Sequence, residues 1–170
     1  MHTNKPLVRK ELAMTAVRTR PALSNDLARA VVDAALAAAR ETELRFAIAV
    51  VDESGHLSAF ARMDGSGLMT IQIAQDKAYT AAAFGLSTTD WHEFVENDAQ
   101  LAPGARTGID RLVTFGGGLP IVVDGQLVGG IGVSGGHWSD DVKIAEAALA
   151  AIPTATAATA ATAATAATAG

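Results

Sequence analysis

The stretch of sequence that decides the fold is FGGGLPIVVDGQLVGGIGVSGG, residues 115–136. Its two apolar runs flank Asp124-Gly125, the dipeptide that best suits a tight hairpin turn with positive φ angles. Three glycines precede the hairpin, and five more lie between Gly129 and Gly136. Because glycine weakens a strand interior, so dense a cluster is typical of bends, or of places where a ligand, a helix or a second subunit approaches the backbone. The stretch therefore predicts a β-hairpin beside a site of close contact.

The segments outside this hairpin predict a mixed α/β domain. Residues 24–40 predict a helix capped by Ser24, and residues 68–84 predict another that Gly85 ends. The run 45–52 is apolar on both faces, which is typical of a strand in the middle of a sheet. Short turns between consecutive strands imply mostly antiparallel pairing, with helices covering the sheet. The remaining expected elements are a return strand over 56–63, a short helix over 89–97, a loop at Pro103-Gly104 and a final helix capped by Ser139.

Three motifs, in order along the chain, resemble the GlcG/HbpS family of haem-binding-protein-like domains, which includes the C-terminal domain of PduO. They are VVDESGHLSAFARMDG (50–65), QDKAYTAAAF (75–84) and GGGLPIVVDGQLVGGIGVSGG (116–136). The resemblance implies a profilin-like α+β domain, with a mostly antiparallel five-stranded sheet covered by helices. It also implies assembly into dimers or multiples of dimers. Some relatives bind haem or iron, and many have no assigned activity, so the resemblance bears more on fold than on chemistry.

The composition predicts one domain between two biased ends. The chain has 170 residues and 49% hydrophobic content, which is enough for a substantial core. We expect a basic N-terminal arm over 1–22, the GlcG/HbpS-like domain over 23–152 and a low-complexity Ala/Thr tail over 153–170. In the tail, threonine recurs every third residue and so defines no single buried face of a helix. The tail is therefore expected to be disordered or weakly ordered, without catalytic residues.

Charge and cysteine content exclude several classes of function. The net charge is −5 and residues 1–20 carry +4, so the rest of the chain carries −9. An acidic body argues against nucleic-acid binding, which needs clustered Lys and Arg. No apolar run is long enough to span a membrane. The absence of cysteine excludes disulfides and thiolate metal sites, and it suits a reducing cytosol, so a cytoplasmic location is expected.

Three charged residues are candidates for a ligand or catalytic site. Lys77 lies on the helix stripe of Ile73 and Phe84, where a lysine either reaches the rim of the domain or is desolvated in a cavity. Arg62 and Asp64 lie just before that helix, so all three side chains are expected to converge. The structural alternative is an Arg–Asp or Lys–Asp ion pair that holds the intervening loop.

Histidine and glycine complete the candidate site. His137 follows two glycines directly before a helix, where an imidazole can act as an acid or base, as a haem or metal ligand, or as an exposed loop residue. No two histidines have the spacing of a paired metal site. The expected ligand-binding set is Arg62, Asp64, Lys77, Gly116, Gly117, Gly118, Gly135, Gly136 and His137.

These residues predict a protein that binds a small ligand, with haem or another planar carboxylated molecule as the named candidate. Arg62 and Lys77 would meet carboxylates, and glycine backbone would admit a flat ring. One alternative is a cofactor-independent lyase, isomerase or hydrolase of a small acidic metabolite, with Lys77, His137 and Asp64 as its catalytic residues. Another is a structural protein whose glycine strands serve assembly. The sequence leaves open whether the protein is an enzyme.

Overall fold

The computed structural model describes residues 19–152. The predicted Ala/Thr tail and most of the predicted basic arm lie outside the described residues. Within 19–152, no helix combines the length and the apolar character needed to cross a membrane. The elements in chain order are α2 (Asn25–Arg40), β1 (Ala47–Asp52), β2 (Leu57–Arg62), α3 (Leu68–Phe84), α4 (Thr88–Glu96), α5 (Leu101–Gly108), β3 (Gly118–Val123), β4 (Gln126–Ser134) and α6 (Trp138–Ala150).

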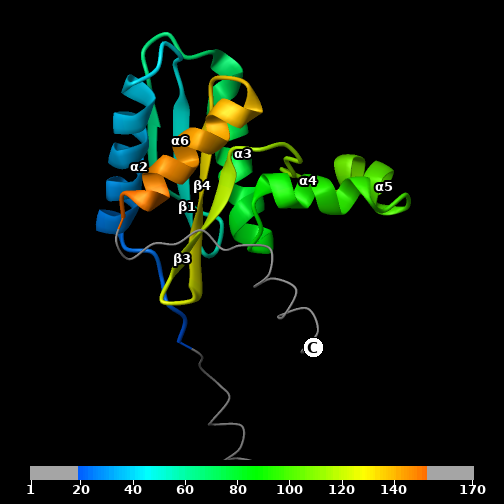
Figure 1. The fold of residues 1–170 in the computed structure, drawn as a ribbon. Helices are drawn as coiled ribbons and strands as arrows, with labels where there is room; N and C mark the ends of the chain where they lie inside the picture. The colour runs from blue at the N-terminus through cyan, green and yellow to red at the C-terminus, as the bar shows by residue number, and fades with distance from the viewer. Residues whose placement is uncertain (1–18, 153–170) are drawn as a thin grey trace, which may run out of the picture.

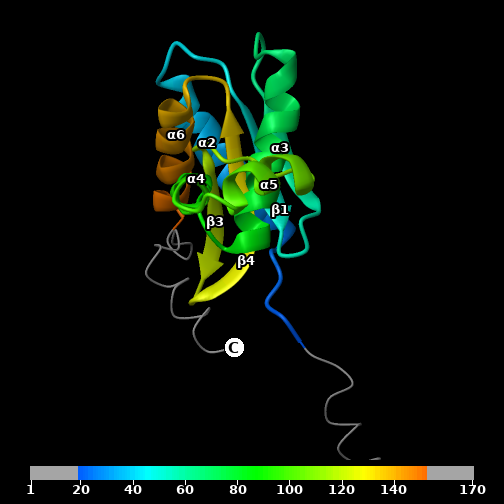
Figure 2. The ribbon, with the colours of Figure 1, turned by 90° about the vertical axis from the view of Figure 1, so that its right-hand side faces the viewer.

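One antiparallel sheet forms the middle layer of the domain. Its strand order is β2-β1-β4-β3, and every neighbouring pair is antiparallel. Helices α2 and α6 cover one face and α3 covers the other, as the two ribbon views show (Figures 1 and 2). The α+β class and the antiparallel pairing are therefore confirmed. The strand number was wrong, because the described residues contain four strands where five were expected.

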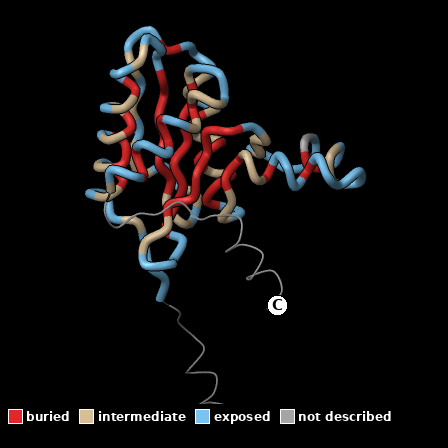
Figure 3. The backbone as a smooth tube through the Cα atoms, in the orientation of Figure 1, coloured by how far each residue is buried: buried red, intermediate tan, exposed pale blue. Residues whose placement is uncertain are grey.

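Strand β1 lies inside the sheet, as its uniformly apolar sequence predicted. Ile48 and Val50, with Phe46 just before the strand, face the main core with α2 and α6, whereas Ala47 and Ala49 face α3. All five side chains are fully buried, and buried backbone follows the strands through the middle of the molecule (Figure 3). This alternation is the two-residue period of a strand that is covered on both sides.

The glycine-rich hairpin allows α3 to pack closely against the sheet. A Cβ on Gly132 or Gly130 would run into the carbonyl oxygens of Ala74 and Ala78, and one on Gly118 would lie 2.5 Å from the Lys77 carbonyl. These glycines let the α3 backbone lie directly on β3 and β4. The close approach that the sequence predicted is thus made, at these strand positions, by a helix of the same chain.

Local boundaries follow the expected chemistry with two corrections. Asp124 and Gly125 have φ angles of 49° and 74°, as the predicted hairpin turn requires. The final helix is capped by His137, not by Ser139. Pro103-Gly104 is not a loop but lies inside α5, where proline is tolerated because the first-turn N–H groups have no helical partner.

Candidate functional site

A buried ion pair marks the centre of the candidate site. Lys77 is 0% exposed, and its ammonium donates to Asp141 Oδ2 at 2.6 Å and to the Val133 carbonyl at 2.9 Å. Asp141 is 2% exposed, and its other oxygen accepts the backbone N–H of Gly136 at 3.1 Å. The pair joins the middle of α3 to the first turn of α6, on opposite sides of the sheet.

A glycine makes room for this pair. Gly117 has a φ of 113°, a conformation that L side chains rarely adopt. A Cβ there would lie 2.6 Å from Asp141 Cβ, 2.7 Å from Lys77 Nζ and 2.8 Å from the Val133 carbonyl oxygen. The sequence run of three glycines before β3 therefore serves two needs, contact with α3 at Gly118 and space for the ion pair at Gly117.

Burial dominates the protonation equilibria of both partners. It lowers the pKa of Lys77 below the ordinary value of 10.5, although the charge and hydrogen bond of Asp141 oppose the shift. It raises the pKa of Asp141, against the opposing effects of Lys77 and of the Gly136 and Gly135 N–H groups. Each charged form therefore loses more by leaving water than it gains from its partner. Either group alone would be a stranded buried charge.

A small cavity with aromatic walls opens beside the ion pair. It has a volume of about 130 Å³ and is lined by Thr89, His92, Phe115, Gly116 and Trp138; we refer to it as the aromatic cavity. Phe115 and Trp138 are 43% and 45% exposed, which is unusual for such large apolar rings. The Phe115 ring centroid lies 4.8 Å from Lys77 Nζ, so this ring of the cavity wall packs against the buried ammonium.

The atoms around Gly116 leave no space for a Cβ at this position. A Cβ on Gly116 would lie 2.7 Å from Val142 Cγ2, 2.8 Å from Thr89 Oγ1 and 2.9 Å from Trp138 Cε3. A larger residue there would fill the cavity or separate α4 from α6. The glycine thus keeps an aromatic-walled hollow open at the junction of these two helices.

His137 lies next to the cavity but is not part of its lining. As the N-cap of α6 it is exposed, its Nδ1 lies 2.9 Å from Ser139 Oγ, and its ring centroid is 5.2 Å from that of Trp138. His92 on α4 lines the cavity itself. In the part of the chain that the structure describes, no group of three or more His, Asp or Glu side chains is placed to hold a metal ion.

The expected convergence of Arg62, Asp64 and Lys77 does not form. Lys77 pairs with Asp141 instead of Asp64, and the Arg62 guanidinium donates to the Ser66 carbonyl at 2.6 Å. Arg62 and Asp64 line a different cavity, next to α2. Of the expected ligand set, Lys77 and Gly117 meet at the ion pair and Gly136 binds Asp141, while Gly116 lines the aromatic cavity.

Sequence reasoning missed Asp141, Phe115, Trp138 and His92 as site residues. Asp141 follows Asp140 at the start of a helix, where acidic residues are ordinary because they complement the helix dipole. Nothing local distinguishes the buried Asp141 from the half-buried Asp140, which pairs with the exposed Lys143. The one available signal was the mixed aromatic and histidine content of 91–94 and 137–138.

Comparison with known proteins gives a consistent result. The family model "Haem degrading protein HbpS-like" matches residues 23–150. Protein GlcG of Escherichia coli K12 is 36% identical over 118 residues, which cover 69% of this chain and 85% of GlcG. The crystal structure of a PduOC–haem complex matches with a TM-score of 0.72 and 32% identity, over 79% of this chain and 97% of that one. A double mutant of HbpS from Streptomyces reticuli matches with a TM-score of 0.74 and 28% identity, over 81% and 91%.

Proposed function

This chain belongs to the HbpS-like family, and from that membership we propose that it binds a small planar molecule bearing carboxylate groups, with haem as the leading candidate. The observation that carries the proposal is the aromatic cavity, in which exposed Phe115 and Trp138 rings stand beside an imidazole. Aromatic walls with few polar groups are typical of sites for flat organic ligands. A relative of this fold has been crystallised with haem, in the PduOC complex.

The residues around the cavity fit a haem group by their chemistry. Imidazole is a common ligand of haem iron; His92 lines the cavity, and His137 lies beside its Trp138 wall. The volume of about 130 Å³ is below the ~300–1,000 Å³ of most ligand pockets, so one chain would enclose only part of the ligand. When bound, haem would supply an iron centre for redox or oxygen chemistry.

Around that ligand, the chain's own residues would act mainly by position. His137 would be the imidazole that holds the haem iron, with His92 as the competing donor. Phe115 and Trp138 would exclude water from the ring face. The Lys77–Asp141 pair would hold the loop of Gly116 and Gly117 against α6 without contacting the ligand.

We propose that a second copy of the chain completes the enclosure, so that the protein is a homo-oligomer. We also propose that it is cytoplasmic. The partial enclosure offered by one chain and the two exposed rings support this assembly. The cytoplasmic assignment is supported by the lack of cysteine.

Haemin titration followed by absorbance tests the proposal. The parent protein should give a Soret band at micromolar concentration, and His137→Ala should shift or abolish it. His56→Ala is the matched control, because His56 is an exposed turn residue whose side chain is 80% exposed. If the Soret band is lost in His92→Ala but retained in His137→Ala, the residue that binds the iron is His92 on α4. A parent protein that gives no haemin spectrum would remove haem and favour another ligand or an enzyme.

One observation favours the enzyme as a second candidate. Lys77 is a buried amine with a lowered pKa, one aromatic ring away from a cavity, which is an environment that suits a general base. Lys77→Arg keeps the charge but removes the neutral base form. If Lys77 transfers a proton, Lys77→Arg should turn over a small acidic metabolite more slowly by a factor on the order of 100. Equal turnover in the parent and in Lys77→Arg would contradict a role of Lys77 as a general base.

A further inference from the structure

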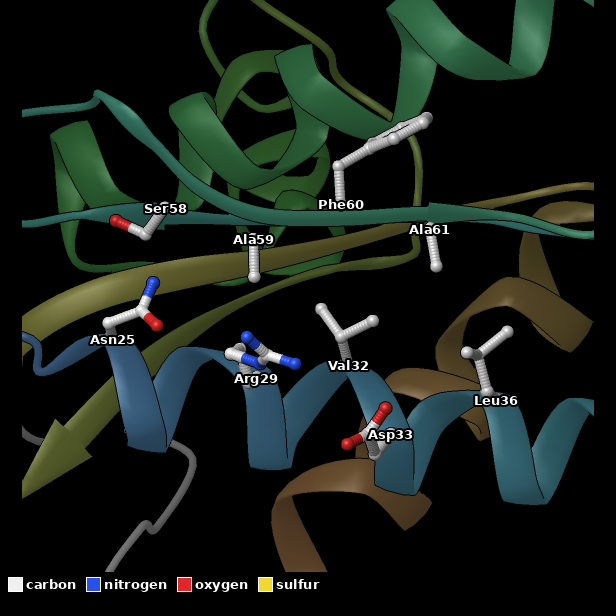
Figure 4. A pocket seen from close by; sticks show the side chains of 9 residues that line it. All are labelled: Asn25, Arg29, Val32, Asp33, Leu36, Ser58, Ala59, Phe60 and Ala61. Carbon is white, nitrogen blue, oxygen red and sulfur yellow. The ribbon is translucent and has the colours of Figure 1, made fainter.

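A second cavity lies where α2 and β2 end, on the α2 side of the sheet. Its volume is about 370 Å³, and three arginines line it: Arg40, Arg45 and Arg62. Arg40 is the last residue of α2 and Arg62 the last of β2, while Arg45 lies just before β1. It shares Leu36 and Ala61 with the groove between α2 and β2, and Figure 4 shows these two side chains directed toward one another. We refer to it as the arginine cavity.

Backbone carbonyls hold two of these guanidinium groups in place. Arg62 donates to the Ser66 carbonyl at 2.6 Å, and Arg45 donates to the carbonyls of Glu43 and Leu44 at 3.2 and 3.0 Å. Neutral carbonyls orient a guanidinium without cancelling its charge. Each of these arginines therefore has further N–H donors for another acceptor, because a guanidinium carries five.

No carboxylate neutralises the three arginines within residues 19–152, since none forms an ion pair there at 4.0 Å or less. Asp64 is the one acidic residue among those that line the cavity. This part of the chain is acidic, so carboxylates are available to pair with cations. Other cations do form ion pairs, among them Lys77 with Asp141, Arg111 with Asp76 and Lys143 with Asp140.

We propose that the arginine cavity binds a small organic anion that carries two or more carboxylate or phosphate groups. Arginine presents a planar fork of donors that matches both groups. Three such forks around about 370 Å³ give space and charge for more than one anionic group. Leu36, Ala61 and Met63 supply apolar lining for a carbon skeleton.

This site is separate from the aromatic cavity, with which it shares no lining residue. It therefore does not depend on the proposed haem function. Binding of haemin should be unaffected by substitutions in the arginine cavity, and binding of the small anion should be unaffected by His137→Ala.

Calorimetric titration of the full chain at constant ionic strength tests the proposal, with citrate as probe and with acetate and inorganic phosphate as separate arms. Arg40→Gln is the principal variant, because Arg40 is exposed and its side chain forms no hydrogen bond or ion pair with another residue of 19–152. Arg62→Gln removes the charge and the hydrogen bond to Ser66 together. It is therefore paired with Arg62→Lys, which keeps the charge and so separates loss of charge from a disturbed loop. Arg29→Gln is the matched control on the same helix, since Arg29 does not line this cavity.

We expect citrate to bind more tightly than acetate or phosphate. Arg40→Gln and Arg62→Gln should each weaken citrate binding roughly fivefold or more, as the loss of a charge-assisted hydrogen bond implies. Arg62→Lys should retain part of the affinity and Arg29→Gln all of it. Asp64→Asn should strengthen binding by removing a like charge. Absence of citrate binding at millimolar concentration, tighter binding of phosphate than citrate, or equal weakening in Arg29→Gln would each overturn the proposal.

Discussion

Lys77 and Asp141 show how two residues that are ordinary in sequence become a costly pair in the fold. Both are almost fully buried, and burial shifts the pKa of each toward its neutral form. The attraction between them compensates for part of the desolvation only while both are present. The pair therefore specifies how α3 and α6 are placed more than it adds stability.

Removal of one partner should be far worse than removal of both. We expect Lys77→Met to lower the free energy of unfolding by about 3–5 kcal/mol, because it strands a buried carboxylate. The double variant Lys77→Met/Asp141→Leu should recover most of this loss, apart from the cost of the unpaired Gly136 N–H. Urea denaturation of the parent, both single variants and the double variant measures the coupling. Additive losses would contradict the role of the pair.

The pH dependence of the same variants has a defined sign. Because folding lowers the pKa of Lys77, the folded protein holds this proton less tightly than the unfolded chain does. The free energy of unfolding of the parent, relative to Lys77→Met, should therefore be greatest above pH 10.5. It should fall as the pH falls through the lowered pKa of the folded state. A difference that is constant with pH would show that Lys77 titrates normally.

At the scale of elements, the decisive contact is α3 against the glycines of β3 and β4. A Cβ at position 132 would meet backbone atoms of α3, including the Ala78 nitrogen at 2.5 Å. Backbone cannot rotate away as a side chain can, so the helix must shift as a body. The separation of α3 from the sheet is thus set by the absence of side chains on β4.

We expect Gly132→Ala to destabilise the protein by roughly 1–3 kcal/mol or more, as overpacking does. Gly104→Ala is the control, because a Cβ there meets nothing within 4 Å and the residue lies inside α5. Alanine should be neutral or slightly stabilising at that helical position. Thermal unfolding of both variants gives the comparison. Similar melting temperatures for the two would mean that the sheet tolerates a displaced helix.

At the scale of the whole molecule, the domain leaves large apolar side chains exposed in several places. Leu68 and Met69 at the start of α3 are 76% and 66% exposed, and the two rings of the aromatic cavity are nearly half exposed. Strand β2 is an edge of the sheet and presents an exposed Leu57. Such features are typical of surfaces that another protein copy covers.

We therefore expect a symmetric dimer or a multiple of it in solution, since closed symmetric assemblies dominate among homo-oligomers. Light scattering coupled to size exclusion should give at least twice the chain mass of 17.3 kDa. Trp138→Ser should weaken both assembly and haemin binding if the second copy completes the aromatic cavity. A mass equal to one chain at working concentration would contradict the assembly.

Local chemistry in the sequence was enough to predict most elements of this fold. The hairpin at Asp124-Gly125, the helix end at Gly85 and the central position of β1 all follow from turn geometry, capping and apolar patterning. These signals act within a few residues, so they can be seen without the tertiary structure. The motifs that resemble GlcG/HbpS predicted the family in the same way, because they are contiguous stretches.

Only the tertiary structure decided what each candidate residue contacts. The sequence singled out Lys77, but its partner lies 64 residues away and has the same local appearance as the half-buried Asp140 beside it. The nearer Asp64 was the natural choice along the chain, yet it lies at the arginine cavity. Likewise, the glycines predicted a close approach without saying that α3 makes it. Sequence periodicity determines which face of an element is buried, whereas the packing of whole helices against the sheet determines which distant side chains meet there.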